Sequence, residues 1–370
     1  MLRPRKPSSV STVEKPAHFF NDRLAGEEPL AFATADRLCR LSASIVAIRP
    51  WEFLADKDLF LLKDPMSGEM CHCSVMGALG EVFSLYVYIG SESYRFFRKV
   101  AAGEPVSSGD FRGSQTGVSV EYVGSAEVTP PDRELLRHFG HPTQKGVGRP
   151  IFRALRPGYY PWYVTEAEGR LLAECMQALV VFCNKHSKQT VNYWTEKDTY
   201  PLLVPMPDSP ESYKIEIVKV PIPLPAMPKP SVLDEARLSK LRAKDYAMRG
   251  CFEADCFYAM AKLGARNERK SFVRIGLVTD AKSGFLFPPE IGMAARSLAE
   301  VLPDAILKAI ETIKFLPEEI RLDKEEFKTV LAPLAQQLGI SLRVVKSSPA
   351  VREAKQGLLA MMGDPSAFRP

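Results

Sequence analysis

The spacing of hydrophobic positions divides the first 220 residues into helices and strands. Apolar residues three or four positions apart lie on one face of a helix, whereas alternation or a short apolar run between turn residues is typical of a strand. The predicted helices are 33–48, 91–101, 132–139 and 166–186. The predicted strands are 59–63, 71–76, 82–89, 117–122 and 213–220. The first three strands form an antiparallel meander, so this part of the chain is predicted to be an α+β domain.

A different order of elements follows in the last third of the chain. The predicted strands are 251–258, 271–279, 285–287, 319–322 and 341–345. The predicted helices are 231–248, capped by Ser231, and 294–315, 325–338 and 351–362. Pro303 is expected to break or restart its helix because proline has no amide hydrogen, and Gly339 closes the next one. After the first helix the order is β-β-β-α-β-α-β-α.

A proline-rich stretch separates the two parts. Proline stands at nearly every second position from residue 221 to residue 230, which favours an extended, stiff spacer. We therefore predict a flexible tail (1–28), an N-terminal α+β domain (29–219), a linker (220–232) and a C-terminal domain (233–370). The alternative for the linker is a ligand for an SH3-type domain.

Composition limits the class of protein without naming an activity. Hydrophobic residues make up 46% and charged residues 25%, as in ordinary globular domains. The net charge of +5 permits an acidic partner such as nucleic acid but does not require one. No apolar run approaches the ~20 residues of a membrane span, and no apolar segment follows the basic start. With seven scattered cysteines, a cytoplasmic protein with free thiols is predicted.

Two stretches of the C-terminal half carry a resemblance to a known superfamily. Residues 275–286 read IGLVTDAKSGFL, a hydrophobic run that reaches an aspartate at a hairpin, and residues 316–323 read LPEEIRLD, a strand that ends on an acid. Together with the element order, residues 250–362 resemble the ribonuclease-H-like catalytic core of retroviral integrases and transposases. The resemblance implies a mixed sheet flanked by helices, so the expected fold class is α/β and α+β.

That resemblance implies three carboxylates at set places. Asp255 falls on the first strand, Asp323 at the end of the fourth, and Glu353 in the last helix. In such folds the acids hold two Mg²⁺ ions ~4 Å apart over one phosphodiester, one activating the nucleophile and one stabilising the leaving oxygen. The implied activity is a Mg²⁺-dependent nuclease or a strand-transfer-like phosphoryl transferase that acts on nucleic acid.

Ordinary structural roles remain open for the same residues. Asp323 before a helix is also a good N-cap, and Glu353 is a typical exposed helix residue. Lys324 follows Asp323 directly and could pair with the acids in place of a metal. The second hypothesis is therefore a non-catalytic binding module. Three converging acids without a lysine or arginine among them would favour the enzyme, and dispersed or salt-bridged acids would favour the module.

A third hypothesis places function in the N-terminal half. A deep apolar cavity lined by Trp51, Tyr86 or Trp162 would indicate a small-molecule binder. The aromatic cluster at residues 159–163, with Arg153 and Arg156 nearby, could stack bases or could be a loop that packs on its own domain.

Two further patterns are weaker. Cys71 and Cys73 share one face of a strand, and His138 with His141 could complete a zinc site, although cysteines in a strand are also ordinary core residues. The whole chain resembles an uncharacterised bacterial family with two successive domains of unknown function. This resemblance is carried by the following residues: Trp51, Asp64-Pro65, 74–77 (SVMG), 86–90 (YVYIG) and 157–162 (PGYYPW).

Overall fold

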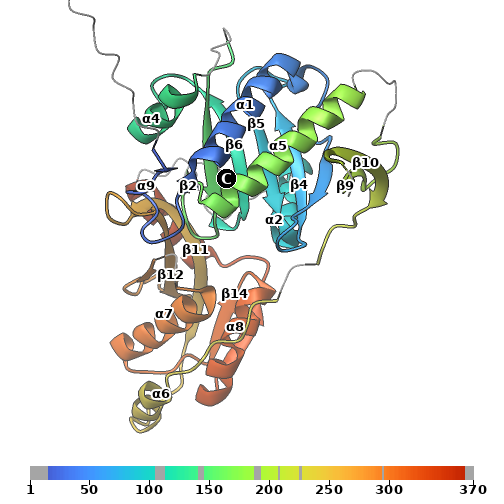
Figure 1. The fold of residues 1–370 in the computed structure, drawn as a ribbon. Coiled ribbons are helices and arrows are strands. Elements are labelled where there is room, and N and C mark those ends of the chain that lie inside the picture. Colours follow the sequence, from blue (N-terminus) through green and yellow to red (C-terminus); the bar gives the residue numbers. More distant parts are fainter. Residues whose placement is uncertain are drawn as a thin grey trace, which may run out of the picture.

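The computed structural model contains two large sheets with separate hydrophobic cores, one above the other in Figure 1, and a small two-stranded sheet of β1 (His18–Phe19) and β2 (Leu30–Ala31). The structure describes residues 16–104, 113–140, 146–186, 193–206, 209–224, 227–293 and 296–362. Both large sheets are mixed and both carry helices, so the predicted fold class is confirmed. Among the described residues, no helix has the length and apolar character needed to cross a membrane.

The N-terminal sheet has eight strands in the order β10-β9-β3-β4-β5-β6-β7-β8. Strands β3 and β9 pair in parallel, and all other neighbours pair antiparallel. The predicted meander is present as β3, β4 and β5. The strands are β3 Phe60–Lys63, β4 Met70–Met76, β5 Phe83–Ile89, β6 Gly117–Val123, β7 Arg149–Leu155, β8 Trp162–Tyr163, β9 Thr199–Met206 and β10 Ser209–Lys219. The hydrophobic pattern did not predict β7, β8 or β9.

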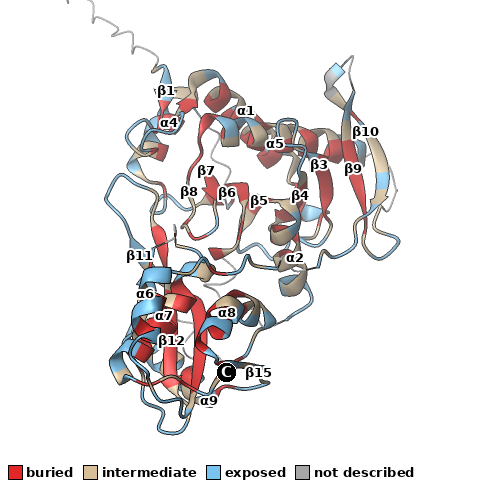
Figure 2. Ribbon diagram, turned by 90° about the horizontal axis from the view of Figure 1, so that it is seen from below, coloured by how far each residue is buried: buried red, intermediate tan, exposed pale blue. Residues whose placement is uncertain are grey.

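Helices cover both faces of this sheet. Helices α1 (Phe32–Ile48) and α5 (Glu166–His186) pack against each other and build the main core on one face. Helix α2 (Gly90–Ala101) packs on β4 and β5 over a smaller cluster, on the opposite face of the sheet (Figure 2). A short 3-10 turn, η1 (Pro50–Glu52), and helix α4 (Pro130–Phe139) complete this half.

Part of the predicted tail is packed. Strand β1 (His18–Phe19) pairs with β2 (Leu30–Ala31), and Phe19, Phe20 and Leu24 are buried in the main core. The predicted tail of residues 1–28 is therefore too long, because its aromatic residues pack over α1 and α4.

The C-terminal sheet has the order β13-β12-β11-β14-β15. The first three strands pair antiparallel, whereas β11, β14 and β15 pair in parallel. Helices α7 and α8 cover one face and α9 covers part of the other. The predicted element order is thus present. The elements are β11 Cys251–Leu263, β12 Ser271–Asp280, β13 Glu290–Gly292, α7 Leu298–Ile313, β14 Glu319–Leu322, α8 Glu325–Leu338, β15 Ser341–Val344 and α9 Pro349–Met361.

Three local predictions in this half are wrong. The third strand is β13, because residues 285–287 contribute only an isolated bridge from Thr279 to Leu286. The first helix, α6 (Glu235–Arg242), is shorter than predicted and is capped by Asp234. Pro303 lies inside α7 without breaking it, since the helix starts at a Ser297–Glu300 capping box and buries its apolar face.

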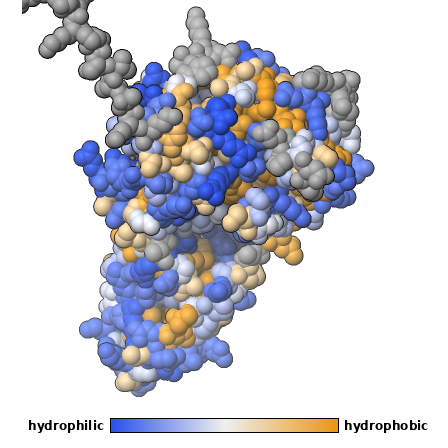
Figure 3. Space-filling model, viewed as in Figure 1, coloured by the Kyte–Doolittle hydropathy of each residue, from blue (hydrophilic) through white to orange (hydrophobic). Residues whose placement is uncertain are grey.

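The segment between the two halves contains no helix or strand over its described residues from 220 to 234. The amide of Ser231 donates a hydrogen bond to the carbonyl of Val330 on α8, so Ser231 is anchored to the C-terminal half and does not cap a helix. The domain boundary at 220–232 and the SH3-ligand alternative stay predictions. In Figure 3, hydrophilic residues cover most of the visible face of the C-terminal half.

Candidate functional site

Two of the three predicted acids meet at the centre of the C-terminal sheet. Strands β11 and β14 run in parallel with Glu253 opposite Arg321. Two residues further along each strand, the same register sets Asp255 beside Asp323 on one face of the sheet. In agreement with this register, the negative charge of Asp255 contributes to raising the pKa of Asp323.

Asp255 is held by a lysine. Its side chain is buried, and its Oδ2 atom accepts a hydrogen bond from Lys355 Nζ of α9 at 2.8 Å. The same ammonium lies 4.3 Å from the centre of the Phe257 ring. The other oxygen, Oδ1, is buried without a hydrogen-bond partner among the described residues. The charge of Asp255 is therefore compensated from inside the protein.

Glu353 lies away from this pair. Helix α9 packs on the sheet through Val351, Lys355 and Leu359, which are spaced four residues apart and so share one face. Glu353 is ~200° around the helix from Val351 and is exposed. The structure brings Asp255 and Asp323 together but does not bring Glu353 to them.

In this arrangement the three acids do not fit a Mg²⁺ pair. Mg²⁺ requires oxygen ligands in octahedral geometry, whereas one oxygen of Asp255 is bonded to an ammonium and the third acid faces outward. Among the residues that the structure describes, no group of three or more His, Cys, Asp or Glu side chains could hold a metal ion. The catalytic and metal roles of Asp255, Asp323 and Glu353 stay predictions.

Asp323 is exposed and has an unusual carboxylate. Nearby protein atoms displace part of its water, and this desolvation, with the charge of Asp255, raises its pKa above the ordinary value of 3.8. It is not the N-cap of α8, because Lys324 occupies that position. The positive charges of Lys324 and Lys355 act on the pKa of the same carboxyl in the opposite direction.

Two residues that complete this site were not predicted from the sequence. Lys355 was not among the predicted residues. Lys324, which the sequence suggested could pair with the acids, lies close enough to Asp323 for its charge to act on the pKa of that carboxyl, and its ammonium is 4.8 Å from the centre of the Phe327 ring. Glu253 is buried, and its Oε2 accepts the Val351 amide at 3.1 Å. A signal for Glu253 was available, since residues 253 and 255 put two acids on one face of a strand.

The cysteines of the zinc hypothesis lie in the main core. Cys71 and Cys73 face Cys175 of α5, and a hydrogen bond with that thiol, followed by burial, raises the pKa of Cys71. Burial raises the pKa of Cys73. His138 belongs to α4, and its ring centre lies 5.6 Å from that of Phe19, whereas His141 lies outside the described residues. The described geometry therefore favours thiols that serve as core side chains.

The aromatic cluster at residues 159–163 joins the two halves of the molecule. Tyr160 stacks on Phe272 at 4.0 Å between ring centres, and its hydroxyl donates to the carbonyl of Met260 at 2.5 Å. The amide of Tyr160 donates to the Lys270 carbonyl, and the amide of Phe272 donates to the Gly158 carbonyl, both at 2.8 Å. The sequence left open whether this loop stacks bases or packs on its own domain. Tyr163 is buried in the N-terminal core, whereas Tyr160 packs on the other half.

The proposed apolar cavity does not form around Trp51. Its side chain is buried against Phe83 and Tyr122, and Gly77 lies so close that a Cβ there would be 2.8 Å from that of Trp51. Two pockets among the described residues are lined by other side chains. One is lined by Asp280, Ser283, Gly284, Phe285, Ile313 and Phe315 and the other by Lys57, Phe97, Arg98, Ala101, Ala102 and Tyr200.

Comparison with known proteins identifies two domains without assigning an activity. Residues 36–203 match the model of a domain of unknown function, DUF7309, and residues 237–359 match that of a second, DUF6930. These matches fit the two-domain uncharacterised family that the sequence resembles. No curated protein matches the chain.

Among solved structures, similarity is found to a chain of the simian T-cell lymphotropic virus intasome in complex with PP2A regulatory subunit B56 gamma. The two are 15% identical, with a TM-score of 0.23 over 40% of this chain. The match spans about half, 49%, of the intasome chain. A similarity this low carries no weight for fold or function.

Proposed function

We propose that this protein is a non-catalytic binding module whose C-terminal half is a ribonuclease-H-like scaffold without metal-dependent phosphodiester chemistry. The observation that carries the proposal is the 2.8 Å ion pair between Lys355 and Asp255. The scaffold part is supported by the sheet itself, which combines a three-stranded antiparallel meander with two parallel strands and alternating helices.

The ammonium of Lys355 supplies the positive charge that a metal would otherwise bring. The side chain of Asp255 is 6% exposed and that of Lys355 is 22% exposed, so the pair is largely shielded from water. Displacing the partner of a buried charge costs on the order of 3 kcal/mol. A divalent ion would have to meet this cost without the third ligand, because Glu353 lies on the far side of α9.

Calorimetric titration of the full chain with Mg²⁺ and Mn²⁺ tests the proposal. We expect no saturable heat with the wild-type protein, and no change on Asp255→Asn or Asp323→Asn. Asp245→Asn, at an exposed acid of the same half, is the matched control. Saturable Mn²⁺ binding that both site variants abolish and the control retains would overturn the proposal in favour of a metal-dependent enzyme.

For the partner, we propose nucleic acid, bound at the outward face of β14 and β15. Arg321 and Arg343 stand opposite each other in the register of these strands, and Glu319 contacts both guanidinium groups. The side chain of Arg343 is 65% exposed. Paired guanidinium groups suit phosphate oxygens, and the net charge of +5 supports the approach of a polyanion.

Binding of a fluorescent oligonucleotide at several salt concentrations tests this partner. We expect Arg343→Ala to weaken binding and to lower the dependence of the logarithm of affinity on that of salt by ~1. Arg133→Ala, at an exposed arginine of α4, should leave both quantities unchanged. This surface would be excluded as the nucleic-acid site if the wild type, Arg343→Ala and Arg133→Ala bound the oligonucleotide with equal affinity, or if the wild type did not bind it at physiological salt.

A further inference from the structure

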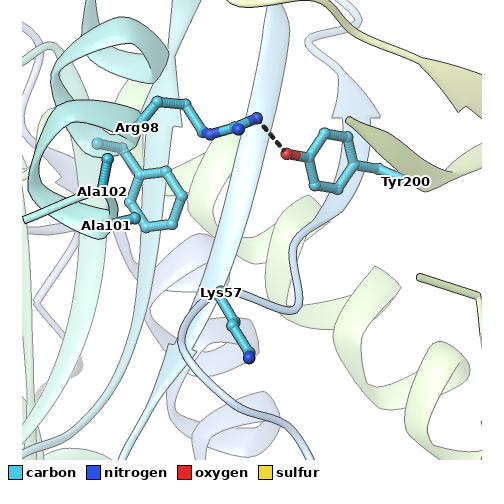
Figure 4. A pocket seen from close by; sticks show the side chains of 6 residues that line it. Lys57, Arg98, Ala101, Ala102 and Tyr200 are labelled. Carbon is cyan, nitrogen blue, oxygen red and sulfur yellow. Dashed lines mark hydrogen bonds between the residues drawn. The ribbon is translucent and has the colours of Figure 1, made fainter. Parts of the chain in front are cut away.

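A pocket of about 220 Å³ opens on the α2 side of the N-terminal sheet. One wall is apolar and comes from the last turns of α2, with Phe97, Ala101 and Ala102. Figure 4 shows the guanidinium of Arg98 reaching toward the hydroxyl of Tyr200, with Lys57 on the other side of the pocket. The pocket therefore combines an apolar wall with two cationic side chains.

The guanidinium of Arg98 is fixed by one of its nitrogens. Nη1 lies 2.5 Å from Asp198 Oδ1, 2.8 Å from the hydroxyl of Tyr200 and 2.9 Å from that of Tyr94. The side chain is 18% exposed. Three oxygens around one nitrogen hold the planar group in a single orientation.

This anchoring leaves the bidentate edge of the same group unused. Arginine has five N–H donors, and the parallel pair on Nε and Nη2 matches two oxygens of a carboxylate or phosphate. In the described part of the chain, neither Nε nor Nη2 of Arg98 donates a hydrogen bond to a protein atom. Arg98, which lines the pocket, thus has two oriented N–H donor groups that make no hydrogen bond to a described residue.

Lys57 adds a second positive charge to the pocket. It is exposed, forms no ion pair with a described residue, and in Figure 4 its ammonium points away from Arg98. Its four-carbon stem can rotate toward a ligand at small cost. Asp56 and Asp58 flank Lys57 in the sequence, so the local net charge is not strongly positive. An anion would therefore be recognised by the two parallel N–H donors of Arg98 more than by the net charge of the pocket.

We propose that this pocket binds a small oxyanion, a carboxylate or a phosphate with two acceptor oxygens, on the Nε–Nη2 edge of Arg98. Lys57 closes over the bound anion, and an apolar substituent of the ligand packs on Phe97 and Ala101. The site lies in the N-terminal half and is independent of the function proposed for the C-terminal sheet.

The test is an NMR titration of the isotope-labelled full chain with inorganic phosphate and, separately, with benzoate, against chloride at equal ionic strength. We expect a saturable shift of the Arg98 Nε–H signal with at least one probe. The probe that saturates at lower concentration assigns the ligand to phosphates or to carboxylates.

Two variants and one control complete the test. Arg98→Lys keeps the charge but removes the fork, and should weaken binding about tenfold or more. Lys57→Met leaves the Arg98 anchor intact and should weaken binding several-fold. Lys63→Met, at another exposed lysine, should bind as the wild type does.

Specific outcomes would overturn the proposal. One is the lack of a saturable shift with either probe up to ~10 mM, the range of weak small-anion binding. Another is an affinity that Lys57→Met and Arg98→Lys leave unchanged, which would place the anion elsewhere on the protein.

Discussion

At the scale of single residues, the most unusual group is a buried histidine. The ring of His72 stacks on that of Tyr94 at 4.2 Å, and its Nδ1 lies 3.3 Å from the carbonyl oxygen of Tyr88. Its Nε2 is buried without a hydrogen-bond partner among the described residues. Burial lowers the pKa of His72 from 6.5 to about 4, because a charged imidazolium would lose its water there.

This shift predicts a dependence of stability on pH. Because the pKa is lower in the folded protein, the unfolded chain takes up the proton first as pH falls. The contribution of neutral His72 to stability is complete above pH 6.5 and is lost as pH falls toward about 4. The free energy of unfolding should fall by up to ~3 kcal/mol over this range.

Urea unfolding at pH 7 and pH 4.5 measures this effect. His72→Phe should reduce the difference in unfolding free energy between the two pH values, since phenylalanine keeps the stack but cannot titrate. The same substitution at the exposed His18 should leave the difference unchanged. A wild-type difference retained in His72→Phe would assign the pH dependence to other groups.

At the scale of elements, the spacing of apolar residues predicted most helices. It missed strands that are defined by pairing with strands distant in the sequence. Helices α1, α5 and α8 lie where the apolar spacing set them. Strand β9 contains Pro201 and Pro205 and was missed, because proline usually marks a loop. It is a strand because β3 and β10 pair with it on either side.

Helix α9 also shows the difference between what local sequence pattern predicts and what packing decides. Its apolar spacing predicted a helix, but only packing on β11 and β12 sets which residues face the sheet. That packing brings Lys355 to Asp255, a residue 100 positions away. It also turns Glu353 outward, so the predicted triad does not assemble.

At the scale of the whole molecule, a contact region formed by described residues of both halves joins them. Besides the stack of Tyr160 on Phe272, Arg269 Nη1 donates to the carbonyl of Ala154 at 3.3 Å, and Arg23 Nη1 donates to Asn267 Oδ1 at 2.6 Å. The segment joining β11 to β12 therefore reaches the N-terminal half, and unfolding of the halves should be coupled through it.

Truncation at this contact region tests the coupling. Tyr160→Ala removes a buried ring and should lower the free energy of unfolding by about 3 kcal/mol or more. Tyr160→Phe keeps the ring and should cost about 1 kcal/mol, the net value of one hydrogen bond. In calorimetry we expect one thermal transition for the wild type and two for Tyr160→Ala.

The neighbouring Tyr159→Ala is the matched control, because Tyr159 is only half-buried. It should shift the transition less and leave it single. An unchanged single transition in Tyr160→Ala would mean that the halves are coupled by other contacts.

The sequence alone determined the order of elements in the C-terminal half and the strand position of Asp255, because helix and strand periods are set by residues within a few positions of each other. It also placed Asp323 at the end of a strand, and parallel pairing then brought it beside Asp255. Tertiary structure alone decided the counter-charge of Asp255, the direction of Glu353 and the partner of Tyr160. These depend on which faces of distant elements pack together, and burial of apolar surface selects those faces without leaving a local pattern in the chain.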